Sequence, residues 1–299
     1  MRRPLPRIGL GCAGIGLAEI SEEVAAATFA MAFRRKIEHF DTSPLYGAGL
    51  SEKRLGRAIR HHLSEGGALP FVSTKAGYRI DFPAGGRQSP AERRQDFSAS
   101  FIHASVEASL MRLGLDRLDM VYLHDIPSAE AIDEAVDALQ TLKVDGRVGG
   151  IGVGVTDCDR AIAAIGRHRL DAVLIAGRQT LLDRRAEAGL LAAAAAQGTT
   201  LVVGGVFNSG ILAAQDPATG RFDYGAAKPE IVAQARRLAE AARREGTSLK
   251  AAALHFVADD PRVAATVLGA TSAVELEECL DLLAQRVAPE ALARIAATR

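Results

Sequence analysis

The sequence has no excess of charge of either sign and no apolar run long enough to cross a membrane. Lysine plus arginine and aspartate plus glutamate both number 36, so the formal net charge is zero. Proteins that bind nucleic acids usually carry a basic face, and we therefore expect no nucleic-acid partner. The longest apolar stretches, such as 190–196 and 199–206, are much shorter than a membrane span. Because the first residues also lack the apolar core of a signal peptide, we expect a soluble, cytoplasmic protein without a membrane partner.

Cysteine is scarce, and its spacing suggests no cross-link. Cys12, Cys158 and Cys279 are odd in number and far apart, without a CxxC motif, which argues against a disulfide framework. Of the seven histidines only His61 and His62 are adjacent, in a context typical of the solvated end of a helix. No third ligand is suitably spaced, so we expect no metal site.

No low-complexity linker or change in composition divides the chain, so we expect one domain over residues 1–299. Short β-rich runs alternate with helical segments rich in Ala, Leu and Arg, which is typical of repeated βα units with a parallel sheet. The runs expected as strands are 7–13, 39–43, 71–76, 118–124, 149–155, 171–177, 199–205 and 263–269. Eight strands in unbroken alternation favour an α/β fold with a closed (β/α)8 TIM barrel, and a doubly wound open sheet is the alternative.

The segments between the strands give further expectations. Ser21 is predicted to be the N-cap of the helix that follows it, and Gly146 marks the end of a helix predicted over 128–146. Segments 81–100 and 208–230 are predicted to be long loops after strand ends, where a barrel builds its active site. The residues in and beside these loops expected to contact a substrate are Tyr78, Phe82, Asp96, Phe97, Phe222 and Tyr224.

Four polar residues stand at or just beyond the ends of three predicted strands, namely Asp41, Tyr46, Lys75 and His124. The C-terminal ends of barrel strands converge on one mouth, so these side chains are expected to share a site. A phenol can exchange a proton with a carbonyl oxygen, and a nearby Lys75 ammonium would favour the Tyr46 phenolate. Asp41 would hold Lys75, and His124 would orient the oxygen. Each residue alone has an ordinary explanation, such as a turn cap or a core histidine, but together they indicate a catalytic site.

These residues lie in stretches that resemble the aldo-keto reductase superfamily. The matching stretches are FDTSPLYGAGLSEKRLGRAI (40–59), VSTKAG (72–77), SVEASLMRLGLDRLDMVYLHD (105–125), LKVDGRVGGIGVG (142–154) and GGVFNSGIL (204–212). The resemblance runs over the whole chain and implies a nicotinamide cofactor, bound across the barrel mouth without a Rossmann domain. It also places Asp41, Tyr46, Lys75 and His124 on the family's catalytic positions. The pairing of AGRQTLLD (176–183) with GGVFNSGIL further resembles the aldose 1-dehydrogenase branch, which includes fucose, galactose and arabinose dehydrogenases and relatives that oxidise pyridoxal.

The resemblance also indicates where the cofactor would bind. The residues expected there are Gly11, Cys12, Ala13, Asp41, Gln179, Val206, Phe207, Asn208, Ser209, Gly210, Gly269, Ala270, Thr271, Glu275 and Glu278. Three of the positions near the nicotinamide depart from the family pattern. Gln179 stands in place of a Tyr that stacks on the nicotinamide ring, Thr156 stands in place of an Asn, and Ala176 stands in place of a Gln. Thr271 stands where the family commonly has an Arg that grips the 2′-phosphate of NADP. With two glutamates nearby, this segment suits NAD better than NADP, which remains the alternative.

These observations together predict a dehydrogenase with a small-molecule substrate. It would oxidise C1 of an aldose, or a related alcohol, with NAD, giving a lactone from a sugar. The close alternative is an NADPH-dependent aldehyde or ketone reductase that uses the same four residues. A nucleotide-sensing binding subunit, like the potassium-channel β-subunits of this fold, is a further alternative that no sequence feature favours.

Overall fold

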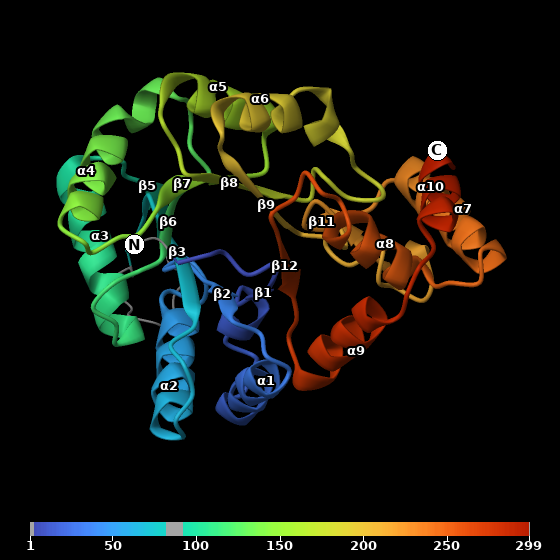
Figure 1. Cartoon of the computed structure of the whole chain (residues 1–299), viewed down its shortest axis with the longest axis horizontal. Helices are drawn as coiled ribbons and strands as arrows, with labels where there is room; N and C mark the ends of the chain where they lie inside the picture. The colour runs from blue at the N-terminus through green and yellow to red at the C-terminus, as the bar shows by residue number, and fades with distance from the viewer. Residues whose placement is uncertain (1–2, 82–91, 299) are drawn as a thin grey trace.

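Eight parallel strands close into a barrel in the computed structural model, which describes residues 3–81 and 92–298. The barrel strands are β1 (Ile8–Gly11), β2 (His39–Asp41), β3 (Phe71–Ala76), β6 (Met120–His124), β7 (Ile151–Val155), β8 (Ala172–Ala176), β9 (Thr200–Gly204) and β12 (Ala265–Gly269). β1 pairs with both β2 and β12, and this pairing closes the ring (Figure 1). Every predicted strand is present, so the prediction of a TIM barrel is confirmed.

Helices surround the strands. They are α1 (Glu22–Arg34), α2 (Leu50–Ser64), α3 (Ala99–Leu113), α4 (Asp133–Val144), α5 (Cys158–Arg167), α6 (Leu190–Gln197), α7 (Pro229–Arg244), α8 (Leu249–Ala258), α9 (Ala273–Ala284) and α10 (Pro289–Ala297). Figure 1 shows them as an outer ring, with α7, α8 and α10 gathered on one side. No helix in the described part of the chain is long and apolar enough to span a membrane.

The strands bury both faces, which explains why they read as continuous apolar runs. Their outward side chains pack under the helices in the main core, and their inward side chains fill the barrel. The inward cluster consists of Phe71, Met120, Tyr122, Ala172, Leu174, Val202, Ala265 and Val267. Gly152 in β7 is required by this packing, since a Cβ there would lie 2.1 Å from the Ala172 carbonyl oxygen and 3.0 Å from the Tyr122 ring.

Two helix predictions can be compared with the structure directly. Ser21 caps α1 as expected, because its Oγ accepts a hydrogen bond from Val24 N at 3.3 Å. The helix predicted over 128–146 begins later, at Asp133, because a 3-10 turn over Glu130–Ile132 precedes it. Its end agrees with the prediction, since Gly146 follows the helix with a left-handed φ of 76°.

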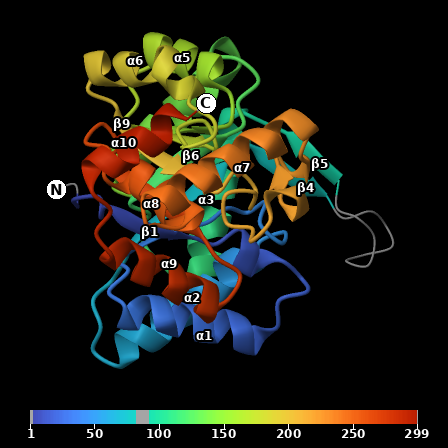
Figure 2. The same ribbon diagram turned by 90° about the vertical axis from the view of Figure 1, so that its right-hand side faces the viewer.

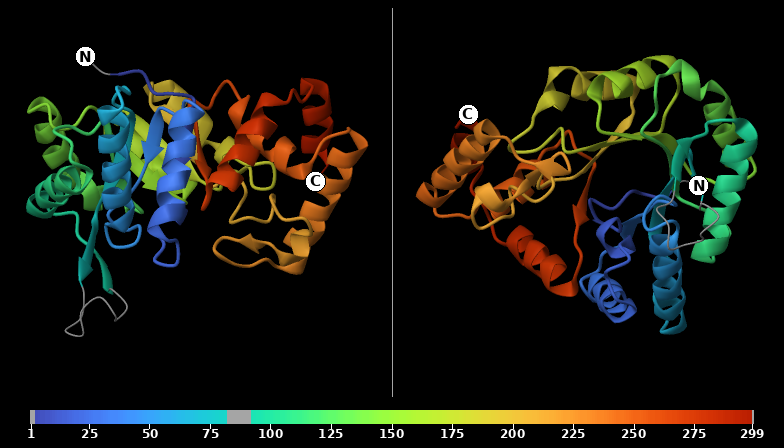
Figure 3. Two further views of the ribbon diagram at one scale, coloured as in Figure 1. Left: turned by 90° about the horizontal axis from the view of Figure 1, so that it is seen from below. Right: turned by 180° about the vertical axis from the view of Figure 1, so that it is seen from behind.

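The two predicted loops contain strands of their own. β4 (Tyr78–Asp81) and β5 (Glu92–Gln95) form an antiparallel ribbon, so the prediction of a loop throughout 81–100 was wrong at β5 and at residues 99–100, which begin α3. The sequence of β5 is ERRQ, which has none of the apolar alternation that identifies a strand. In the second segment, β10 (Arg221–Phe222) and β11 (Gly225–Ala226) form a short hairpin. Both features project from the same end of the barrel (Figures 2 and 3).

Candidate active site

Asp41 and Lys75 form a buried ion pair at the C-terminal ends of β2 and β3. Lys75 Nζ donates to Asp41 Oδ2 at 2.5 Å and to the Thr42 carbonyl oxygen at 2.9 Å. Burial disfavours the charge on Lys75, but the attraction of Asp41 and Tyr46 outweighs it, so the pKa of Lys75 is raised. Lys75 therefore remains an ammonium across the physiological pH range.

Two residues that sequence analysis missed hold Asp41 from the other side. Ser73 Oγ donates to Asp41 Oδ1 at 2.8 Å and lies 3.1 Å from His39 Nε2. His39 is fully buried, and this burial lowers its pKa to about 4, so the imidazole is neutral. His39 and Ser73 precede Asp41 and Lys75 by two residues on the same strands, so the period of a strand places each pair on one face. That period is the signal that could have identified them.

Tyr46 lies over the ion pair, with Lys75 Nζ 4.8 Å from the centre of its ring. Burial raises the pKa of Tyr46, and the Lys75 ammonium lowers it by less, so the net shift is upward. The phenol is therefore neutral near pH 7, and the expected preference for the phenolate is outweighed by burial. The next residue, Gly47, has a φ of 60°, and a Cβ there would lie 1.9 Å from the Gly16 carbonyl oxygen. Only glycine fits this close approach of two loops beneath the phenol.

His124 ends β6 and faces Tyr46 edge-on, with ring centroids 6.1 Å apart. Its Nδ1 lies 3.3 Å from Ser43 Oγ, which also accepts from Leu45 N at 3.1 Å. A hydroxyl that donates to Nδ1 leaves the proton on Nε2, and this tautomer can donate a hydrogen bond to a substrate oxygen. Burial, followed by the Lys75 charge, lowers the pKa of His124 to about 3, so the ring is neutral.

Two adjoining hollows occupy the barrel mouth. The mouth cavity, of about 660 Å³, contains Tyr46, Lys75 and His124 in its lining. The glycine cavity, of about 260 Å³, has glycines at or just after strand ends in its lining, namely Gly11, Gly177, Gly204, Gly205 and Gly269. Tyr46 and Tyr224 line both hollows. A backbone cradle beside the candidate catalytic residues fits a group that must approach closely, such as a flat ring or a phosphate.

The residues expected to bind a cofactor divide into two sets. Six of them line the glycine cavity, namely Gly11, Ala13, Asp41, Asn208, Ser209 and Gly269. The residues that line neither hollow are Cys12, Gln179, Val206, Phe207, Gly210, Ala270, Thr271, Glu275 and Glu278. Gln179 is fully buried, and its Nε2 donates to Asp260 Oδ2 at 3.2 Å, so its side chain is held away from the mouth. Cys12 is also fully buried, and this burial raises the pKa of its thiol, as expected for a packing residue.

The segment after β12 is rich in carboxylates. Thr271 donates to Glu275 Oε2 at 2.8 Å from both its backbone N and its Oγ1. Glu278 pairs with Lys250 of α8, and their side-chain atoms are 2.7 Å apart. Sequence analysis missed Lys250, because the fold alone brings α8 beside α9. The pairing with Glu278 compensates the positive charge of Lys250.

A hairpin is attached beside the glycine cavity by an arginine that sequence analysis also missed. Arg178 donates to Asp223 Oδ1 at 2.7 Å and Oδ2 at 3.2 Å, and to the Thr156 carbonyl oxygen at 2.8 Å. Tyr224 N donates to Ser209 Oγ at 2.9 Å. Asp223 and Tyr224 have φ values of 46° and 64°, which suit a tight two-residue turn between β10 and β11. These bonds place Tyr224 in the wall of both hollows.

The expected substrate contacts are partly at the mouth. Tyr78 and Tyr224 line the mouth cavity, whereas Asp96, Phe97 and Phe222 do not. Phe82 lies outside the described residues. Sequence analysis missed five polar residues of the lining, which are Arg93, Gln95, Asp125, Asp157 and Arg160.

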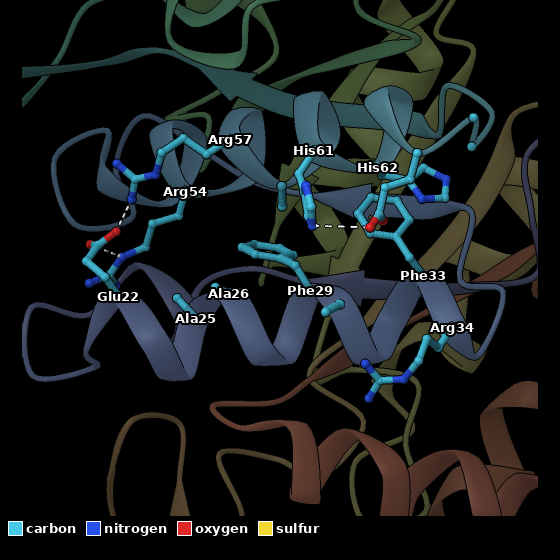
Figure 4. A pocket seen from close by; sticks show the side chains of 15 residues that line it. Glu22, Ala25, Ala26, Phe29, Phe33, Arg34, Arg54, Arg57, His61 and His62 are labelled. Carbon is cyan, nitrogen blue, oxygen red and sulfur yellow. Dashed lines mark hydrogen bonds and ion pairs between the residues drawn. The ribbon is translucent and has the colours of Figure 1, made fainter.

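A separate groove of about 890 Å³ lies outside the barrel between α1 and α2. Figure 4 shows its apolar floor, with Phe29 and Phe33 of α1, and a charged rim that includes Glu22 and Arg57. It shares no lining residue with either hollow at the mouth. The greater size of this groove therefore has no bearing on the candidate active site.

Comparison with known proteins gives matches that run along almost the whole chain. The model of the Aldo/keto reductase family matches residues 7–299. The chain is 33% identical to D-threo-aldose 1-dehydrogenase from Pseudomonas sp., covering 99% of this chain and 94% of that protein. It is 30% identical to pyridoxal 4-dehydrogenase from Microbacterium luteolum, covering 95% and 91%. A glycerol dehydrogenase structure from Gluconobacter oxydans superposes with a TM-score of 0.82 at 24% identity, covering 99% of this chain and 91% of that one, which supports the fold.

Proposed function

The chain belongs to the aldo/keto reductase family, and from that membership we propose that it is an aldose 1-dehydrogenase that oxidises C1 of a cyclic sugar to a lactone with NAD. Its class is oxidoreductase, and members of its family use a nicotinamide nucleotide. The observation that carries the proposal is the buried Asp41–Lys75 pair under Tyr46, which faces His124 across the mouth cavity. Similarity to D-threo-aldose 1-dehydrogenase supports the choice of an aldose.

The side chains at the mouth have distinct roles in this proposal. The C1 hydroxyl of the sugar would accept a hydrogen bond from His124 Nε2 and lose its proton to the Tyr46 oxygen. Lys75 stabilises the negative charge on that oxygen, and Asp41 keeps Lys75 charged and in place. A bound nicotinamide would supply the acceptor for the hydride that leaves C1. The residues that would hold it are those lining the glycine cavity, with Gly11, Asn208 and Gly269 among them.

The preference for NAD rests on the charges after β12. A 2′-phosphate in this region would meet Glu275, which is bonded to Thr271, and Glu278, whose charge Lys250 already compensates. In the part of the chain that the structure describes, Glu275 has no cationic partner, and such a carboxylate favours a free ribose hydroxyl and disfavours a phosphate. We therefore expect NAD to bind more tightly than NADP.

One observation supports the reverse reaction as a second candidate. Because the pKa of Tyr46 is raised, its phenol carries a proton near neutral pH and can donate it to a carbonyl oxygen. A reductase of aldehydes or ketones would use the same four side chains.

Initial rates with a panel of aldoses, pyridoxal and simple alcohols, using NAD and NADP in parallel, test the proposal. We expect the highest rates with an aldose and NAD, and a loss of about 10²- to 10⁴-fold in kcat for Tyr46→Phe, because the proton acceptor is removed. Turnover of carbonyls with NADPH, without oxidation of any alcohol, would select the reductase. Equal activity of Tyr46→Phe and the unmodified protein would contradict both.

A further inference from the structure

Asp125 is a carboxylate at the mouth cavity that the catalytic arrangement leaves unused. It directly follows His124, and its side chain is 40% exposed. Among the described residues, no backbone or side-chain N–H or O–H donates to its carboxylate. Burial raises the pKa of this carboxyl more than Lys75 and Arg160 lower it. The group is thus partly desolvated and lacks the donors that would compensate for the lost water.

The backbone holds Asp125 firmly in an unusual conformation. Its φ is 49°, which is uncommon for a residue other than glycine and typical of functional sites when the surroundings enforce it. Two bonds do so here, since Asp125 N donates to the Gly154 carbonyl oxygen at 2.8 Å and Gln95 Nε2 donates to the Asp125 carbonyl oxygen at 2.6 Å. The backbone from which the carboxylate projects is therefore held by β7 on one side and by the β4–β5 ribbon on the other.

The position of Asp125 relative to His124 points to a pair of neighbouring oxygens. Asp125 Oδ2 lies 3.8 Å from His124 Nε2, the donor expected to bind the reacting oxygen. Oxygens on adjacent carbons are separated by about one hydrogen-bond length, so one can bind Nε2 while the other donates to Oδ2. Since His124 is neutral, the 3.8 Å contact is not an ion pair that would occupy the carboxylate.

We propose that Asp125 binds the hydroxyl on the carbon next to the reacting carbon, and that the enzyme selects substrates with two vicinal oxygens, such as the C1 and C2 oxygens of an aldose. This inference rests on the proposed function and deepens it by assigning the residue that recognises the second hydroxyl. A substrate without that hydroxyl leaves the Asp125 carboxylate desolvated and unpaired. An unpaired polar group in the site discriminates between two substrates more strongly than a difference in substrate size does.

The test compares an aldose that the enzyme oxidises with its 2-deoxy analogue, using the unmodified protein, Asp125→Asn and Asp96→Asn. Asparagine tolerates a positive φ, so Asp125→Asn should keep the backbone of the site. Asp96 is a matched control from the adjacent wall, because its carboxylate accepts from Arg79 and Ser98 and lines neither hollow. We expect Asp125→Asn to lower kcat/KM for the aldose about 10- to 100-fold, because a hydrogen bond to a charged group contributes a factor of this size. For the 2-deoxy analogue, kcat/KM should stay within about twofold of that of the unmodified protein. Asp96→Asn should change neither rate.

Equal effects of Asp125→Asn on both sugars, or no effect on either, would overturn the role of Asp125 while leaving the dehydrogenase intact. If the unmodified protein oxidises no sugar but reduces carbonyls, the aldose proposal fails. The role of Asp125 is then tested by comparing the reduction of glyceraldehyde, which has a hydroxyl next to the carbonyl, with that of propanal, which has none. Asp125→Asn should then impair glyceraldehyde selectively, and equal effects on both aldehydes would again overturn the inference.

Discussion

At the scale of single residues, the site sets two effects on Tyr46 against each other. Burial favours the neutral phenol and Lys75 favours the phenolate, and burial is the larger effect. Oxidation requires Tyr46 to accept a proton, so only the deprotonated fraction is active. Because the pKa of Tyr46 lies above its usual value near 10, that fraction grows about tenfold for each pH unit between 7 and 10.

This balance predicts opposite pH dependences for the two directions. We expect log kcat/KM for alcohol oxidation to rise with a slope near one from pH 7 to 10, while carbonyl reduction stays nearly level because the phenol is protonated throughout. Measuring both profiles at saturating cofactor checks this expectation. An oxidation profile that reaches a plateau near neutral pH would mean that Lys75 stabilises the phenolate more than burial opposes it.

The Asp41–Lys75 pair makes a separate prediction about stability. Replacing Lys75 with methionine leaves Asp41 buried without its partner, which should cost about 3–5 kcal/mol of unfolding free energy. The double variant Asp41→Asn, Lys75→Met removes both charges and should recover much of that loss. Urea unfolding of the three proteins measures the difference, and equal stability of the single and double variants would show that the Asp41 charge is compensated by other groups.

At the scale of elements, the β10–β11 hairpin depends on Arg178. Arg178 is 8% exposed, and its guanidinium connects the Thr156 carbonyl oxygen after β7 to Asp223 in the turn. We expect Arg178→Met to release the hairpin from the glycine cavity and to weaken cofactor binding about tenfold, equivalent to about 1.4 kcal/mol. Fluorescence titration of the reduced cofactor measures this change. Arg236→Met is the matched control, because Arg236 pairs with Asp216 on the exposed surface. If both variants bound the cofactor as tightly as the unmodified protein, the hairpin would have no part in holding it.

The comparison of sequence with structure is also clearest at this scale. All eight barrel strands could be predicted, because a strand buried on both faces needs a continuous apolar run. β5 could not be predicted, since residues 93–95 are exposed and the sequence ERRQ has no apolar alternation. The four candidate catalytic residues could be predicted to lie together, because barrel topology brings adjacent strand ends to one mouth. The pairing of Lys250 with Glu278 and the orientation of the Gln179 side chain depend on how helices and loops pack. A local sequence pattern does not contain that information.

At the scale of the whole molecule, two buried neutral histidines should limit stability in acid. His39 has its pKa lowered to about 4 and His124 to about 3, in both cases chiefly by burial. Between those values and the ordinary value of about 6.5, the unfolded chain binds protons that the folded protein does not. The free energy of unfolding therefore falls as the pH is lowered through this range.

The expected size of this loss follows from linkage between protonation and folding. Each histidine contributes a slope of up to about 1.4 kcal/mol per pH unit, so the two together should remove about 6 kcal/mol between pH 7 and pH 4. Urea unfolding at several pH values measures the slope, and His39→Gln should reduce it by about half in the range where both residues contribute. His61→Gln is the control, because His61 is exposed at the end of α2 and should leave the slope unchanged. A flat profile down to pH 4.5 would mean that the folded protein accepts protons at these positions, and the neutral His124 required for orienting the substrate would then be lost over the same range.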